Sequence, residues 1–249
     1  MDEATPPSTG GGAPNGCAVI VTGGAPLEIG VLSIVDEARL VVAADSGLDH
    51  LLAWGRLPHL VVGDLDSVSP AALLEAQRRG VPVDRHPTDK DATDTELALV
   101  AALDRGFGDL TLLTGGGDRL DHVMGWLAVL ADRRLAAAHR VAAWCGTTHL
   151  QVLHGPRRHR WREPDLDAVV SLLPLAGDCH GVTTTGLRWP LDDATLSATS
   201  SRGVSNAVAD TELTVGLTSG VLAVVRPQRR ATPPSTLDPL DPLRPRRRS

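Results

Sequence analysis

The sequence has almost no aromatic residues apart from tryptophan. It contains no Tyr, one Phe (Phe107) and five Trp among 249 residues. Proteins that bind single-stranded nucleic acids stack the bases on aromatic side chains, so this composition argues against that role. Residues 17–225 carry a net charge of about −9, which repels phosphate backbones unless a cation bridges the two. We therefore expect no nucleic-acid partner, and favour a nucleotide that arrives with a metal ion.

Cysteine and long apolar runs are also scarce. The three cysteines, Cys17, Cys145 and Cys179, form no CxxC pair, which argues against a disulfide framework or a zinc site and is typical of a reducing compartment. The N-terminus shows no basic segment followed by an apolar one, so we expect no secretory signal. No apolar run reaches the roughly 18 residues of a membrane span. We predict a cytoplasmic protein with no membrane partner.

Composition divides the chain into four parts. Residues 1–16 are rich in Pro, Gly and Ser, and residues 227–249 are rich in Arg and Pro, so both are expected to be disordered tails. Residues 17–139 alternate short apolar runs with amphipathic stretches, which predicts an α/β domain with a parallel, Rossmann-like sheet. Residues 140–226 contain successive strand-like runs separated by turns, which predicts an antiparallel β-sandwich domain.

The apolar periodicity gives approximate bounds for these elements. The strands predicted in the first domain are Cys17–Gly23, Arg39–Ala44, Leu57–Val62, Val81–Arg85 and Asp109–Thr114. The main helices predicted there are Pro70–Arg79, Thr93–Asp104 and Arg119–Ala138. The strands predicted in the second domain are Arg140–Trp144, Thr148–Leu153, Ala168–Pro174, Gly181–Leu187, Glu212–Leu217 and Gly220–Val225.

Acidic residues follow the predicted strands of the first domain. Asp45 follows the second strand, Asp64 and Asp66 follow the third, Asp94 follows the fourth, and Asp121 follows the fifth. The carboxyl ends of parallel strands lie along one rim of an open sheet, where ligands bind. Each acid taken alone could simply be a turn or N-cap residue. Four such segments together favour a shared site, and Mg²⁺ would relieve the repulsion between the carboxylates.

Other residues in these segments suit a phosphate ligand. Lys90 is the only lysine of the chain and lies within the acidic segment, where a compact ammonium could contact a phosphate. Thr93 and Asp94 begin a predicted helix, and a helix N-terminus either binds anions or is simply capped. The glycines before Arg119 would allow a ligand to approach the backbone, although they match no phosphate-loop motif.

Five ordered segments of the chain together resemble the thiamine pyrophosphokinase family. They are ADSGLDHLLAWGRLPHLVVGDLDS (44–67), PTDKDATDTELAL (87–99), GGGDRLDHVMGWLAVL (115–130), GLRWPL (186–191) and GVSNAVADTELTVGLTSGVLAVV (203–225). The resemblance covers about residues 17–226. It implies an α/β catalytic domain that binds ATP and Mg²⁺, a β-sandwich domain that binds thiamine, and a homodimer with active sites at the subunit interface.

The resemblance also implies the reaction and the roles of individual residues. The family transfers a pyrophosphoryl group from ATP to the hydroxyl of thiamine and releases AMP. The metal and phosphates would be surrounded by four carboxylates, Asp45, Asp64, Asp66 and Asp94. ATP would be contacted by Lys90, Thr93 and Arg119, and Asp121 is the candidate general base. Thiamine would be reached by Ser205 and Asn206 of the second subunit.

Some features depart from the family pattern, and other functions stay open. Ser46 replaces a usual glycine, and Ala207 and Val208 follow Asn206 where many relatives carry an acidic or aromatic residue. Trp189 is expected to pack in the sandwich core, with a stacking face for a ligand as the alternative. A pyrophosphokinase for another hydroxymethyl heterocycle, such as a pterin, shares the same phosphate chemistry. A non-catalytic sensor of thiamine or its phosphates is a further alternative, whereas a nicotinamide enzyme lacks its glycine motif here.

Overall fold

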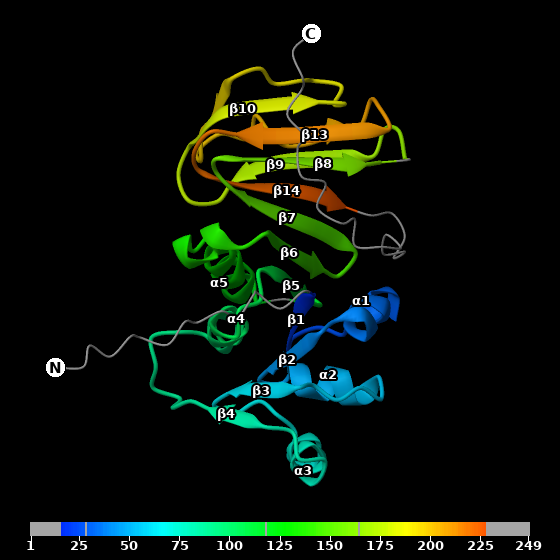
Figure 1. Ribbon diagram of the computed structural model, residues 1–249, viewed down its shortest axis with the longest axis vertical. Helices are drawn as coiled ribbons and strands as arrows, with labels where there is room; N and C mark the ends of the chain where they lie inside the picture. The colour runs from blue at the N-terminus through cyan, green and yellow to red at the C-terminus, as the bar shows by residue number, and fades with distance from the viewer. Residues whose placement is uncertain (1–15, 28, 118, 164, 228–249) are drawn as a thin grey trace, which may run out of the picture.

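The computed structural model describes residues 16–227 except 28, 118 and 164. One ten-stranded sheet runs through this part of the chain, and a four-stranded sheet packs over one end of it (Figure 1). The two tails expected at 1–16 and 227–249 lie outside the described residues, apart from Gly16 and Pro227.

The ten-stranded sheet has the order β12-β9-β14-β7-β6-β5-β1-β2-β3-β4. Its strands are β1 (Cys17–Thr22), β2 (Leu40–Ala44), β3 (Leu60–Gly63), β4 (Val83–Arg85), β5 (Asp109–Thr114), β6 (Arg140–Cys145), β7 (Thr148–His154), β9 (Val169–Pro174), β12 (Asn206–Ala207) and β14 (Val221–Pro227). The smaller sheet has the order β11-β10-β13-β8 and consists of β8 (Arg157–Arg162), β10 (Cys179–Thr185), β11 (Ala194–Leu196) and β13 (Glu212–Leu217).

Strands β1 to β6 pair in parallel, and helices cover both faces of this part of the sheet. The helical elements are α1 (Leu32–Glu37), α2 (Gly47–Ala53), α3 (Pro70–Arg78), α4 (Asp94–Asp104) and α5 (Leu120–Leu130), with short 3-10 turns η1 (Ile29–Val31) and η2 (Arg133–Ala137). Helices α1 to α3 lie on one side of the parallel strands, and α4 and α5 lie on the other (Figure 1). The α/β architecture predicted for this half is confirmed.

Alternation along β1 shows how the sequence builds two cores. Ile20 points into the core under α4 and α5, whereas Val19 and Val21 point into the core under α1 to α3. All three side chains are fully buried. A strand that is buried on both faces carries a continuous apolar run rather than a polar and apolar alternation, which is the pattern of β1 and β2.

The second half forms the predicted sandwich, but its first strand pairs differently from the prediction. Strand β6 is parallel to β5, and the antiparallel pairing begins only with β7. A third core lies between the two sheets and includes Trp161, Leu172 and Val215. The ten-stranded sheet therefore runs continuously through the chain position at which the second domain was expected to begin.

Two local predictions need correction. The helix predicted over 119–138 ends at Leu130, because Asp132 takes extended backbone angles and its side chain accepts a hydrogen bond from the Arg134 N–H, which starts η2. Strand β8 was not predicted, since its sequence RRHRWR is rich in charge. Within the described part of the chain, no helix combines the length and the hydropathy that a bilayer crossing requires.

Candidate active site

A cleft of about 880 Å³ lies at the carboxyl ends of the parallel strands. Strand β1 lies between β2 and β5 in the sheet, and the helices that follow β1 and β5 cover opposite faces of it, α1 on one face and α5 on the other. Such a change of direction is where open α/β sheets bind ligands. The lining residues come from strand ends and from α4 and α5: Thr22, Gly23, Gly24, Ala25, Ala44, Asp45, Ser46, Ser67, Thr93, Asp94, Thr95, Thr114, Gly116, Gly117, Arg119, Asp121, His122, Val123, Gly125 and Trp126.

Three carboxylates meet beside the ends of β2 and β3. Asp45, Asp64 and Asp66 each offer an oxygen within 4.8 Å of the others. Asp45 and Leu65 adopt left-handed backbone angles, with φ of 49° and 68°. Non-glycine residues rarely adopt this conformation, and where they do it often serves a functional site. At Leu65 it lets Asp64 Oδ1 accept a hydrogen bond from the Asp66 N–H at 3.2 Å.

Lys90 links this cluster to helix α4. Its ammonium donates to Asp64 Oδ2 at 2.6 Å and lies 3.2 Å from Asp94 Oδ1. The hydrogen bond from Lys90 lowers the pKa of Asp64. Burial acts to lower the pKa of Lys90, but the interactions with Asp64 and Asp94 outweigh it and raise that pKa. Lys90 therefore stays charged and holds two strand-end acids together.

Two buried carboxylate oxygens of the cleft are poorly satisfied: Asp45 Oδ1 accepts no hydrogen bond from the described residues, and Asp94 Oδ1 has only the ion pair with Lys90. Burial raises the pKa of Asp45, and the nearby Asp94, Asp66 and Asp64 raise it further. Gly63 permits this crowding, since a Cβ there would lie 3.1 Å from Asp94 Cγ and 3.3 Å from Asp45 Cβ. Carboxylate oxygens that lack donors and repel one another are what a hard divalent cation such as Mg²⁺ would satisfy. The residues present thus fit a metal site.

Backbone amides and small residues also line the cleft. Helix α4 begins here, and its N-cap residue Thr93 accepts a hydrogen bond from the Glu96 N–H at 3.3 Å. The glycine loop after β5 packs closely on the loop after β1, because a Cβ on Gly115 would lie only 1.9 Å from the Ala25 carbonyl oxygen. A helix N-terminus beside close-packed glycines is a surface to which phosphate oxygens can approach.

Arg119 and Asp121 form an ion pair at the mouth of the cleft. The Arg119 guanidinium donates two hydrogen bonds to the Asp121 carboxylate, at 2.9 and 2.6 Å. These bonds hold the pKa of Asp121 well below its usual range. Both side chains are more than 60% exposed, so they can turn toward a ligand. In this arrangement Asp121 is a weak base that becomes available only when Arg119 moves to another anion.

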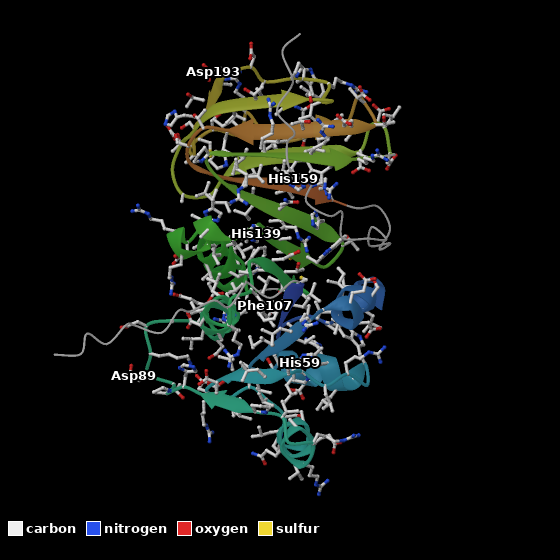
Figure 2. The ribbon with its side chains drawn as sticks, viewed as in Figure 1. His59, Asp89, Phe107, His139, His159 and Asp193 are labelled. Atoms are coloured by element: carbon white, nitrogen blue, oxygen red, sulfur yellow. The ribbon has the colours of Figure 1, made fainter. Side chains whose placement is uncertain are left out.

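The structure does not bring every predicted site residue to this cleft. Asp45, Thr93, Asp94, Arg119 and Asp121 line it, and Asp64, Asp66 and Lys90 adjoin it. Ser205 and Asn206 are absent from its lining, which within the described residues comes entirely from the stretch between Thr22 and Trp126. In Figure 2, Asp89, on the loop from β4 to α4, and Asp193, on the loop from β10 to β11, lie in opposite halves of the molecule.

The loop from β10 to β11 also carries Trp189. Its side chain is 58% exposed, so the expectation that it packs in the sandwich core is wrong. Asn206 lies beside it and is buried. Ser205 has a φ of 61°, and its N–H donates to Ser171 Oγ at 3.0 Å. The β-rich half therefore presents its own aromatic surface, away from the acidic cleft.

Sequence reasoning missed several lining residues. Thr22, Ser46 and Ser67 bring hydroxyl groups to the cleft, and Trp126 brings a buried indole. The small polar residues directly follow strands, as the acids do, so the rule that located the acids could have found Ser46 and Ser67. Trp126 gave no such signal, because one tryptophan within an apolar helix is usually a core residue.

Known proteins match both halves of the chain. A family model described as "Thiamin pyrophosphokinase, catalytic domain" matches residues 31–141, and one described as "Thiamin pyrophosphokinase, vitamin B1 binding domain" matches residues 158–222. A thiamine pyrophosphokinase of Bacillus subtilis is 26% identical over 191 residues, which are 77% of this chain and 88% of that protein.

Solved structures show the same arrangement. The crystal structure of the Bacillus subtilis thiamine pyrophosphokinase has a TM-score of 0.74 at 24% identity and covers 86% of this chain and all of that one. The crystal structure of a thiamin pyrophosphokinase from Geobacillus thermodenitrificans has a TM-score of 0.70 at 26% identity, over 85% of this chain and 97% of that one. These similarities extend across the cleft and the β-rich half alike.

Proposed function

Because the chain belongs to the thiamin pyrophosphokinase family, we propose that its acidic cleft binds ATP and that a second copy of the chain supplies the thiamine surface. The reaction joins the hydroxyl oxygen of thiamine to the β-phosphorus of ATP, and the bond from that phosphorus to the oxygen retained by AMP breaks. The products are thiamine diphosphate and AMP. One observation carries the assignment: acids from separate strand ends meet around Lys90 beside a helix N-terminus.

In this proposal Mg²⁺ would be held by Asp45, Asp64 and Asp66, with Asp94 beside them. The fit rests on the 4.8 Å grouping of three carboxylates and on the buried Asp45 Oδ1, which lacks a donor among the described residues. When bound, the ion would offset negative charge on the phosphate groups, which repel both the acids and the incoming alcohol. The residues around it then act mainly by positioning and by charge neutralisation.

The basic groups would bind the phosphate chain. Lys90 has a compact ammonium that can release one carboxylate and contact a phosphate oxygen once the metal is bound. The free N–H groups at the start of α4, beside Thr93, would point toward a second phosphate oxygen. Arg119 would leave Asp121 for the transferred group, and Asp121 would then accept the hydroxyl proton of thiamine. That proton leaves during or after formation of the P–O bond, since a primary alcohol is a weak acid.

A homodimer would complete the site. Trp189, Ser205 and Asn206 lie outside the cleft of their own chain, and Leu120 and Met124, more than 60% exposed on α5, leave an apolar surface at its edge. A second copy could cover this surface and bring the exposed indole of Trp189 to the cleft, where it would stack on a thiamine ring.

The three cysteines are unpaired, which supports placing this reaction in the cytoplasm.

Mass spectrometry of the products formed from ATP, Mg²⁺ and thiamine tests the reaction. We expect thiamine diphosphate and AMP in equal amounts. A hydroxymethyl pterin should not be converted when it replaces thiamine. Conversion of the pterin but not of thiamine would overturn the substrate assignment. Thiamine binding that persists in EDTA, without turnover in Mg²⁺, would identify a sensor instead.

Complementation between two variants tests the dimer. Asp66→Asn damages the cleft and Trp189→Ala damages the thiamine surface. If one site draws on two chains, a mixed dimer of these variants contains one intact site, and coexpression should restore activity at low thiamine concentration. If each chain carries a whole site, both sites stay damaged and no activity returns.

A further inference from the structure

Three hydrogen bonds tie the side chain of Asn206 to backbone groups of its own chain. Its Oδ1 accepts hydrogen bonds from the Trp189 N–H at 3.2 Å and from the Ala207 N–H at 2.8 Å. Its Nδ2 donates to the Trp189 carbonyl at 2.7 Å. The residue is only 9% exposed, and both of its polar atoms bind backbone. Asn206 therefore braces Trp189, and has little surface of its own with which to meet a ligand.

Further contacts fasten the same loop to β12. The Arg188 N–H donates to the Ala207 carbonyl at 2.8 Å, and Leu187 forms an isolated β-bridge with Val208. The Arg188 guanidinium lies 5.7 Å from the centre of the Trp189 ring. Its other contact is an ion pair with Asp167. The loop backbone is thus tied down on both sides of Trp189, although the indole itself is exposed.

An exposed indole on a loosely held loop would lose conformational freedom on binding a ligand, which weakens binding. Fixing the backbone beforehand removes part of that cost. We infer that Asn206 is a positioning residue for thiamine: its hydrogen bonds to both backbone polar groups of Trp189 hold the indole where the substrate ring meets it. This inference rests on the proposed function, and it replaces the direct contact between Asn206 and thiamine that the family resemblance implies.

A double-mutant cycle separates the two roles. The variants are Asn206→Ala, Trp189→Ala and the double variant, each assayed for the KM of thiamine, the KM of ATP and kcat. Asn206→Ala should raise the KM of thiamine about tenfold, as expected for the loss of one or two hydrogen bonds, and leave the KM of ATP unchanged. If Asn206 acts through Trp189, the double variant should be no worse than Trp189→Ala alone.

Additive effects in the double variant would overturn the inference, since they would show that Asn206 contacts the substrate independently. An unchanged KM of thiamine in Asn206→Ala, with a raised KM in Trp189→Ala, would also overturn it and leave the proposed function intact. Failure of the unmodified chain to form thiamine diphosphate would instead remove the proposed function and the inference with it. An unaffected KM of thiamine in Trp189→Ala would overturn the inference alone.

A matched control is available at Asp178 in the same half of the chain. Its Oδ1 accepts from the Ala198 N–H at 2.9 Å and from Ser197 Oγ at 3.1 Å, so it also braces a loop. Asp178→Ala should leave both KM values unchanged. If circular dichroism shows Asn206→Ala to be unfolded, Asn206→Asp replaces it in the cycle, because it keeps both acceptor bonds and turns the donation to the Trp189 carbonyl into a repulsive contact between two oxygens. It should raise the KM of thiamine at least threefold, and an unchanged KM overturns the inference.

Discussion

The cleft and the β-rich half differ in how their charged side chains are paired. In the cleft, a buried oxygen of Asp45 has no hydrogen-bond partner among the described residues, and that of Asp94 has only the ion pair with Lys90. In the sheet, Arg226, whose side chain is only 11% exposed, donates to Glu163 Oε2 at 3.1 Å, and its other terminal nitrogen lies 3.1 Å from His149 Nδ1. Only its Nε lacks a partner within the described part. In the cleft one cation, Lys90, is shared between two of the four carboxylates, whereas in the sheet the carboxylate of Glu163 has a cation of its own.

This difference separates residues kept for binding from residues kept for the fold. An unpaired buried oxygen destabilises the free protein and is retained where a ligand will satisfy it. A buried ion pair contributes to stability only while both partners are present. One chemical change, from carboxylate to amide, should therefore have different effects in the two regions. In the cleft it should remove activity, and in the sheet it should remove stability.

The largest effect is expected for Asp66→Asn. The amide keeps the volume of the side chain and removes the charge of an exposed member of the three-carboxylate group. We expect kcat/KM to fall by about 10²–10³-fold, the loss typical of removing one electrostatic group from an active site, with unchanged circular dichroism. AMP release at saturating Mg²⁺ measures it. Asp104→Asn, at the exposed end of α4, is the matched control and should keep full activity. Substantial activity in Asp66→Asn would contradict the metal assignment.

Glu163→Gln should show the reverse pattern. The change leaves the buried guanidinium of Arg226 without its charged partner, and removing one member of a buried pair typically costs about 3 kcal/mol. We expect the free energy of unfolding in urea to fall by about that amount, while the KM values of ATP and thiamine stay unchanged. Glu212→Gln, which breaks the exposed pair with Arg160, should cost less than about 1 kcal/mol. Equal losses in the two variants would show that burial does not set the cost.

The sequence predicts the parallel half well, because its signals are local and repeated. Predicted bounds for β5 match the structure, and β1, β2 and α4 differ by one residue at one end. The parallel pairing of β6 was missed, because the strands that follow α5 were assigned together to the second domain. The helix between β5 and β6 is the local sign of a parallel crossover, and the two residues between β6 and β7 are the sign of an antiparallel hairpin.

The acids of the cleft were predictable because they follow strands whose ends must lie together. The position of Asn206 outside the cleft was not predictable from local patterns, since it depends on how two distant segments of the chain pack. The brace on Trp189 joins residues 17 positions apart through backbone atoms, which any sequence supplies. In the sequence, the only sign of these hydrogen bonds is the presence of Asn206, and a single Asn more often indicates a turn.

The free energy of unfolding should depend on pH through His149, which lies beside Arg226. Burial holds the pKa of His149 well below its ordinary 6.5, and the charge of Arg226 lowers it further. The folded protein therefore keeps His149 neutral, whereas the unfolded chain binds a proton below pH 6.5. Stability should fall as the pH drops below that value, by up to about 1.4 kcal/mol per pH unit from this residue. His149→Gln should lower this slope by one proton, measured by urea unfolding between pH 7 and 5.5. An unchanged slope would mean that His149 can be protonated in the folded state.

The smallest effect, and the one that opposes Glu163→Gln in sign, is expected for Asp45→Asn. Burial and the nearby carboxylates raise the pKa of Asp45, so its charge destabilises the folded protein at neutral pH. The amide removes that repulsion, and the free energy of unfolding should rise by about 1 kcal/mol, as is common when a strained functional group is replaced. Added Mg²⁺ should raise the Tm of the unmodified protein and have a smaller effect on the variant, because a ligand stabilises the state that binds it. Lower stability in Asp45→Asn, with the same response to Mg²⁺, would show that the oxygen without a donor has a structural partner and that the cleft and the sheet follow one rule.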